Sequence, residues 1–311
     1  MNNTKIKLRG ICPILPTPFD QENQVDVDSL RREVRFLLEC GVDGIALFGN
    51  ASESFALTQE EKEQIARVVV DETGRRVPLI FGAGGTSTET AVVSCRWARD
   101  TGADVLMIMP PYMIKPDAQR IYEYYAGIAS SMDTPIMIQD APGACGVSIG
   151  IDTILRLTGE FDSIQYVKAE APPTFQMVKR LVDASEGKFA VFGGLNGTFF
   201  YEELRAGAVG SMPAGEFPDV LVQVYRLYAA GDRTQAKRVF YQYLPFIRLG
   251  SIPGGSAMSV HKEILKRGGI FTTSNVRGPY VPANDFLKEL VDDCVDGLKL
   301  KALEWSAERR D

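Results

Sequence analysis

The segment SIQYVKAEAP, residues 163–172, joins an apolar run to a lysine and a glutamate, Lys168 and Glu170. The run has the length and apolar character of a buried strand. Side chains two positions apart on a strand point to the same face, so the amine and the carboxylate should enter the same space. Amphipathic segments of helical spacing separate this run from others like it. The strand-like runs are residues 10–19, 43–49, 77–84, 104–111, 134–142, 163–172, 189–197 and 208–215.

This alternation predicts parallel strands joined by crossover helices. The runs are almost continuously apolar, which favours a closed barrel with helices outside and packed side chains inside. We therefore expect an α/β fold, a (β/α)8 TIM barrel over residues 8–220. A C-terminal extension of about three helices, residues 221–311, should pack on the barrel. In this architecture the active site lies at the carboxyl ends of the strands.

Composition excludes several classes of function. The chain has 311 residues, is 45% hydrophobic and carries a net charge of −6, with its basic residues scattered. We expect no nucleic-acid partner, because no basic patch could follow a phosphate backbone. The start, MNNTKIKLRG, lacks a signal-peptide core, and no later run approaches the ~20 apolar residues of a membrane helix. A cytoplasmic protein without a membrane partner is predicted.

The cysteine and histidine content limits the chemistry further. The five cysteines are far apart and form no CxxC pair, which indicates reduced thiols. The only histidine, His261, follows GGSAMSV in a late helical segment. Neither a histidine-based metal site nor a Ser-His-Asp triad can be assembled from one histidine. We expect no metal and no cofactor.

Lys168 is the first candidate for catalysis. A lysine at the inner end of a barrel strand is desolvated, which penalises its ammonium form and makes the neutral amine available to attack a ketone. The alternative is a lysine at a strand terminus whose amine extends to water. The position of this strand, sixth in an eightfold pattern, favours the chemical interpretation.

Three motifs resemble one known family. GNASES (49–54), PIMIQDAPGACGV (135–147) and YVKAEA (166–171) are similar to motifs of the dihydrodipicolinate synthase and N-acetylneuraminate lyase family of class I Schiff-base aldolases. The resemblance covers essentially the whole chain. It implies that Lys168 forms an imine with a small-molecule 2-oxo acid substrate. It also implies that the loop around Ala51 and Ser52 holds the substrate carboxylate through backbone N–H groups and a hydroxyl, and that the chain forms a homo-oligomer, the family's tetramer.

The chain departs from the family pattern where protons are handled. The family usually places a tyrosine at the end of strand five, where this chain has Gln139, and the other relay positions fall at Asn50 and Met113. The arginine that synthases place near a dicarboxylic substrate falls at Ala144. These departures disfavour dihydrodipicolinate synthesis. Glu170 is then the best candidate for proton transfer, although it could instead hold the rim together in an ion pair.

An amine with a carboxylate and no phenol suits elimination. An imine at C2 of a 2-keto-3-deoxy sugar acid acidifies the C3 protons, so a nearby carboxylate can remove one. Loss of the C4 hydroxyl then completes a dehydration. The chain is most similar to the family's dehydratases of 2-keto-3-deoxypentonates, with L-2-keto-3-deoxyarabonate, converted to 2-oxoglutarate semialdehyde, as the expected substrate. The alternatives are a pyruvate-dependent aldolase and a non-catalytic regulatory protein that binds a 2-oxo acid.

Three further residues are expected to contact the substrate. Gln139 can donate and accept hydrogen bonds and is assigned to substrate positioning. Asn196, after strand seven, could orient a substrate hydroxyl, or it could be a turn residue in a left-handed conformation. Gly194 would allow close approach of the backbone.

Overall fold

The computed structural model describes residues 8–252 and 255–305. Its strands form one parallel sheet in the order β1-β8-β7-β6-β5-β4-β3-β2. Ile14, just after β1, bridges both Ala46 in β2 and Ala214 after β8, which closes the sheet. The predicted (β/α)8 barrel is confirmed. The strands are β1 Gly10–Ile11, β2 Ile45–Leu47, β3 Leu79–Gly82, β4 Val105–Ile108, β5 Ile136–Asp140, β6 Ile164–Ala169, β7 Ala190–Gly193 and β8 Gly210–Ser211.

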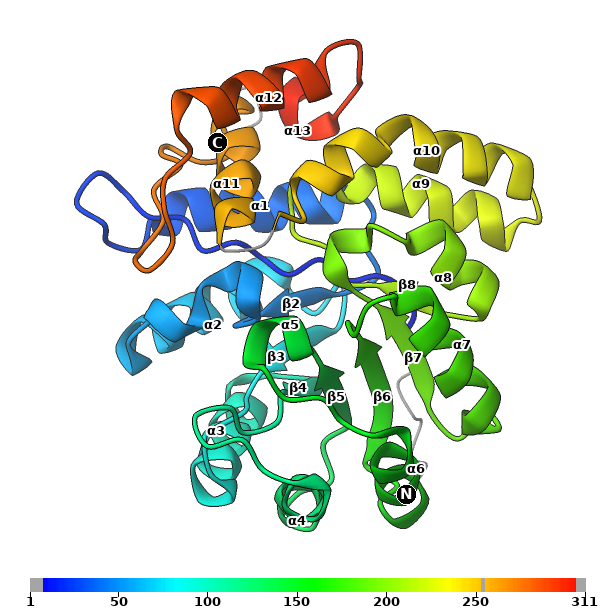
Figure 1. Cartoon of the computed structure of the whole chain (residues 1–311). Helices are drawn as coiled ribbons and strands as arrows, with labels where there is room; N and C mark the ends of the chain where they lie inside the picture. The colour runs from blue at the N-terminus through cyan, green and yellow to red at the C-terminus, as the bar shows by residue number, and fades with distance from the viewer. Residues whose placement is uncertain (1–7, 253–254, 306–311) are drawn as a thin grey trace.

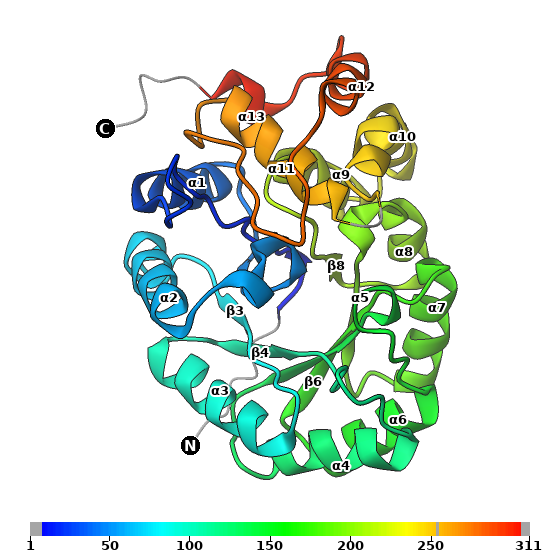
Figure 2. The same cartoon turned by 60° about the vertical axis from the view of Figure 1, so that its left-hand side comes forward.

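Helices surround the strands, as Figures 1 and 2 show from two sides. Their ends follow local signals: Asp26 caps the first helix, and Thr58 with Glu61 forms a capping box on the second. Each helix buries an apolar stripe against the barrel. The barrel helices are α1 Val27–Glu39, α2 Gln59–Thr73, α3 Thr88–Thr101, α4 Ala118–Ala129, α6 Ile151–Glu160, α7 Thr174–Ser185, α8 Phe200–Ala206 and α9 Pro218–Ala229. Short helices in the loops are η1 Asn50–Ser52, η2 Ser54–Ala56, α5 Pro142–Cys145 and η3 Leu195–Gly197.

Two layers of apolar packing result from the alternation of side chains along the strands. In β6, Tyr166 belongs to the core inside the barrel, whereas Val167 and Ala169 belong to the core between the barrel and its helices. Lys168 is two positions beyond Tyr166, so it continues the inward row. The period of the strand therefore places the lysine inside the barrel at its carboxyl end.

The C-terminal part of the chain is helical and gathers on one side of the barrel, near α1 and α9 (Figure 2). It comprises α10 Arg233–Leu249, α11 Ser256–Arg267, α12 Asp285–Val295 and the short α13 Lys301–Glu304. The helices α9 and α10 are separated because Gly231 adopts a left-handed conformation and Asp232 caps α10. The expected boundary after residue 220 falls inside α9. Within the described ranges, no helix combines the length and apolarity needed to cross a bilayer.

Candidate active site

Lys168 lies at the carboxyl end of β6 with its side chain only 1% exposed. In register with it are Gln139 at the end of β5 and Phe192 in β7. The aromatic ring of Tyr166 packs against Phe192 one layer deeper in the barrel. The amine is therefore held at the bottom of the barrel mouth, with apolar packing beneath it.

Glu170 meets Lys168, as the strand period predicts. Its Oε1 atom is 3.3 Å from the Lys168 Nζ atom, and its side chain is 12% exposed. Gln139 Nε2 donates to Oε2 at 2.7 Å, and the Leu195 N–H donates to Oε1 at 3.4 Å. The carboxylate is thus fixed by contacts from β5 and from the loop after β7. Gln139 was expected to position the substrate, and in the structure its amide donates a hydrogen bond to Glu170.

A cavity of about 180 Å³ opens above this pair. Asn50 and Ala51 line it from the loop after β2, and Asn196 lines it from the loop after β7. Met258 and His261 line it from α11. The cavity therefore has walls from the barrel and a further wall from the C-terminal helices.

The structure separates the two residues expected to bind the substrate carboxylate. Ala51 lies in the cavity wall, whereas Ser52 is buried and is not among the residues that line the cavity. The Ser52 hydroxyl donates to the Leu15 carbonyl at 2.7 Å, and the Ser52 N–H donates to the Gly49 carbonyl at 3.1 Å. The Ser52 hydroxyl is thus tied to the segment after β1 and its N–H to its own loop, so both donors already have partners within the protein.

Asn196 and Gly194 are also committed to contacts within the protein. Asn196 has the left-handed conformation, with φ of 55°, that was one of the two alternatives for it. Its amide donates to the Gly250 carbonyl at 3.1 Å and accepts from the Ala214 N–H at 2.8 Å. A Cβ atom at Gly194 would lie 2.3 Å from Glu170 Cγ. The close approach that Gly194 permits is therefore to Glu170.

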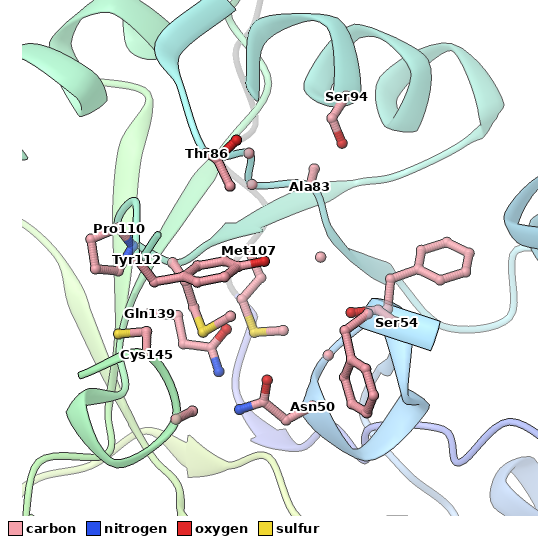
Figure 3. A pocket seen from close by; sticks show the side chains of 18 of the residues that line it. Asn50, Ser54, Ala83, Thr86, Ser94, Met107, Pro110, Tyr112, Gln139 and Cys145 are labelled. Atoms are coloured by element: carbon pink, nitrogen blue, oxygen red, sulfur yellow. The ribbon is translucent and has the colours of Figure 1, made fainter. Parts of the chain in front are cut away.

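A second cavity, of about 360 Å³, adjoins the first between the loops after β2, β3 and β4. Asn50 lines both cavities. Figure 3 shows the amides of Asn50 and Gln139 and the ring of Tyr112 projecting into this space. Lys168 and Glu170 line the smaller cavity and not the larger one.

The charge of Glu170 acts on two buried carboxyl groups, those of Asp140 and Glu203. Burial raises the pKa of Asp140 to about 6, and the charge of Glu170 adds to this effect, while the Ile149 N–H opposes it. Burial raises the pKa of Glu203 to about 8, opposed chiefly by a hydrogen bond from the Thr174 hydroxyl. Protonation of these groups reduces the negative charge around Glu170.

His261 was excluded from metal and triad chemistry by the sequence, yet it lines the cavity that contains Lys168. Its Nδ1 atom is 2.6 Å from Oε1 of Glu216, and both side chains are buried. The signal available in the sequence was that this is the only histidine of the chain. Among residues 8–252 and 255–305, no three His, Cys, Asp or Glu side chains are grouped as a metal ion would require.

Comparison with known proteins gives consistent results. The model of the dihydrodipicolinate synthetase family matches residues 7–296. L-2-keto-3-deoxyarabonate dehydratase of Azospirillum brasilense is 31% identical over 279 residues, covering 87% of this chain and 88% of the relative. A 4-hydroxy-tetrahydrodipicolinate synthase of Chlorobium phaeovibrioides is 34% identical over 252 residues, covering 80% and 84%. The crystal structure of dihydrodipicolinate synthase from Rhodopseudomonas palustris superposes with a TM-score of 0.87 at 28% identity, covering 93% and 97%.

Proposed function

Because the chain belongs to the dihydrodipicolinate synthetase family of Schiff-base lyases, we propose that it dehydrates a 2-keto-3-deoxy sugar acid through an imine on Lys168. The proposed substrate is L-2-keto-3-deoxyarabonate and the product is 2-oxoglutarate semialdehyde. The observation that carries the proposal is the position of the Glu170 carboxylate, 3.3 Å from the Lys168 amine, beside Gln139. The similarity to the Azospirillum dehydratase supports the same choice.

The proposed reaction begins when the Lys168 amine attacks C2 of the substrate and water leaves, forming an imine. The imine withdraws electrons from C3, and Glu170 removes a C3 proton to give an enamine. The enamine electrons then expel the C4 hydroxyl, so the net change is loss of one water. Proton shifts convert the resulting C3–C4 alkene to the C5 aldehyde, and hydrolysis of the imine frees Lys168.

The group at the end of β5 favours elimination over carbon–carbon cleavage. Cleavage between C3 and C4 needs a base on the C4 hydroxyl, and the Gln139 amide cannot accept that proton near neutral pH. Its amide is also engaged with Glu170 at 2.7 Å. Gln139 therefore orients the base that acts at C3, and Ala51, in the cavity wall, is left in the proposal to contact the substrate carboxylate through its backbone.

Product analysis tests the function directly. Incubation with L-2-keto-3-deoxyarabonate should give 2-oxoglutarate semialdehyde by mass spectrometry, whereas pyruvate with glycolaldehyde would mean aldol cleavage. Borohydride added during turnover should attach the substrate to Lys168. The Lys168→Ala variant should lose both the adduct and turnover, while Lys62→Ala, a lysine of the neighbouring cavity, should keep the adduct. Saturable binding without turnover would favour the regulatory alternative.

The Glu170→Gln variant separates imine formation from proton removal. Glutamine preserves the shape of the side chain but removes its basicity, so borohydride should still trap pyruvate on Lys168. Dehydration should fall by roughly 10²- to 10⁴-fold, the usual contribution of a general base. Equal turnover of the variant and the unchanged enzyme would assign Glu170 to an ion pair that only stabilises the rim.

We also propose a homo-oligomer, a tetramer, that works in the cytoplasm. The loop before α4 exposes contiguous apolar side chains, with Tyr112 at 46%, Met113 at 77% and Ile114 at 84%. An exposed apolar patch of this kind is typical of an interaction surface, and light scattering would give the mass of the assembly. All five cysteines are free thiols, which suits a reducing compartment.

A further inference from the structure

Dehydration needs an acid as well as a base. Hydroxide is a poor leaving group, so the C4 oxygen must receive a proton as the C4–O bond breaks. In the proposed reaction Glu170 takes the C3 proton and Lys168 is bonded to C2. Of the described residues that line the cavity, the only other titratable side chain is His261.

We propose that His261, held by Glu216, is the acid that protonates the leaving C4 hydroxyl. This inference rests on the proposed dehydration and names a third catalytic residue for it. His261 lies on α11, outside the barrel strands. It therefore lines a different wall of the cavity from Lys168, which lies on β6.

The geometry leaves one ring nitrogen for the substrate. Nδ1 is 2.6 Å from Oε1 of Glu216, a fully buried carboxyl group in the loop after β8. With Nδ1–H donated to that carboxylate, Nε2 is the nitrogen that exchanges a proton. Within the described part of the chain, no residue hydrogen-bonds to Nε2. A carboxylate that orients an imidazole in this way fixes its tautomer and its direction.

The His261–Glu216 pair, here called the dyad, contacts the loop that holds Glu170. A Cβ atom at Gly250 would lie 3.1 Å from His261 Cε1, 3.3 Å from Glu216 Oε1 and 2.6 Å from Asn196 Nδ2. Asn196 in turn follows Leu195, whose N–H points to Glu170. The base and the proposed acid are therefore braced by one set of contacts at the same cavity.

The step is balanced in atoms and charge. The electron pair of the C3–H bond ends as the π bond between C3 and C4. The electron pair of the C4–O bond leaves with the oxygen, which takes the proton from His261 Nε2 and departs as water. His261 then regains a proton as the aldehyde tautomer forms and Glu170 returns its proton to carbon. The other charged groups near the dyad are Glu33, close enough to Glu216 for their charges to interact, and Lys262, the next residue on α11.

The His261→Gln variant tests the proposal. Glutamine can still donate to Glu216 but cannot supply a proton, so dehydration should fall by roughly 10²- to 10⁴-fold. Borohydride trapping of pyruvate on Lys168 and exchange of pyruvate methyl protons in deuterium oxide should remain, because they need only the amine and the base. Ser259→Ala is the matched control on α11, since among the described residues its hydroxyl bonds only to Ser256 within the helix.

An analogue with fluorine in place of the C4 hydroxyl gives the decisive comparison. Fluoride leaves without prior protonation. The His261→Gln variant should therefore release fluoride at close to the rate of the wild-type enzyme. Full dehydration by the variant, or loss of trapping together with turnover, would overturn the proposal. If that variant does not fold, Glu216→Gln should show the same selective loss and the same rescue by fluorine. An unchanged enzyme that makes pyruvate and an aldehyde would instead sink the proposed function.

Discussion

At the scale of single residues, Gly194 determines where the Glu170 carboxylate, the proposed base, can lie. A methyl group on Gly194 would lie 2.3 Å from Glu170 Cγ, so the Gly194→Ala variant must displace the Glu170 side chain. The backbone there is not left-handed, with φ of −148°, so the substitution adds no backbone strain. Turnover should fall by roughly 10- to 100-fold, the usual result of a misplaced catalytic group.

Steady-state kinetics with a thermal melt would test this prediction. Gly159→Ala is the matched control, because a methyl group at Gly159 in α6 has nothing within 4 Å. The control should keep turnover, and its melting temperature should not fall, because alanine favours a helix more than glycine does. A Gly194→Ala enzyme that was fully active would mean that the exact position of Glu170 does not limit the reaction.

The pairing of Lys168 with Glu170 could be predicted at this scale, because the period of a strand is local information. The roles of Gly194 and Ser52 could not. A short motif that resembles those of relatives does not indicate which of its hydrogen-bond donors already have partners within the protein. The Ser52 hydroxyl, for example, donates to the carbonyl of Leu15, 37 positions away in the chain. Long-range hydrogen bonds of this kind are settled only by packing.

At the scale of elements, a buried lysine joins α11 to the loop after β2. Lys262 forms an ion pair with Glu53, donates to the Asn275 carbonyl at 2.7 Å and is fully buried. The other Glu53 oxygen accepts the Arg277 N–H at 2.8 Å. Burial lowers the pKa of Lys262 to about 8, against the attraction of Glu53. The loop that contributes Ala51 is thus anchored to the C-terminal region.

Breaking this ion pair should be costly. Lys262→Met leaves Glu53 buried without its cation, so the free energy of unfolding should fall by about 3–5 kcal/mol. Adding Glu53→Gln should restore part of that loss, because the unpaired charge is then removed. Urea denaturation of both variants and their combination measures the coupling. Lys266→Met, an exposed position of the same helix, should change stability little, and equal losses from both lysine variants would refute the coupling.

The ends of most elements followed from local signals, but their contacts did not. The break between α9 and α10 is an example of a local signal, because Gly231 suits a helix end and Asp232 a helix start. The amphipathic pattern of α11 predicted a helix, yet nothing local indicated which face would meet the barrel mouth. His261 reaches the cavity because α11 packs there, 93 positions after Lys168.

At the scale of the whole molecule, the stability should depend on pH through Glu203. Burial raises its pKa from 4.5 to about 8, so between these values the folded state binds more protons than the unfolded state. The stabilisation is complete below the unfolded pKa and is lost as pH rises through about 8. The shift is about 3.5 pKa units, so at ~1.4 kcal/mol per unit the full loss is about 5 kcal/mol.

Glu203→Gln should therefore flatten the decline of unfolding free energy between pH 5 and pH 8.5 (roughly the window set by these pKa values). Urea denaturation across that range gives the measurement. Glu186→Gln, at an exposed side chain, should leave the slope as it is. A variant at Glu203 whose slope matched the unchanged protein would assign the pH dependence to other groups.

The overall architecture was the most predictable property, because eight similar units each repeat the same apolar pattern. The barrel closes around Ile14, which bridges both neighbouring strands beyond the end of β1, and the adjacent Pro13 carbonyl and Leu15 N–H bond to Ala46. The composition of the active site was less predictable, since its walls come from the loops after several strands and from α11. The repeated strand–helix pattern predicts the barrel. The site depends on loop and α11 residues that do not belong to this pattern.

The location of α11 has a genetic consequence. Lys168 lies on β6 and Glu170 directly after it, whereas His261 lies on α11, 93 positions after Lys168. A frameshift between β8 and Ser256 would keep the codons for imine formation and proton removal and lose the codon for the proposed acid. Under the proposed mechanism, alleles truncated there would lack the acid for water loss even where the codons for Lys168 and Glu170 are still translated.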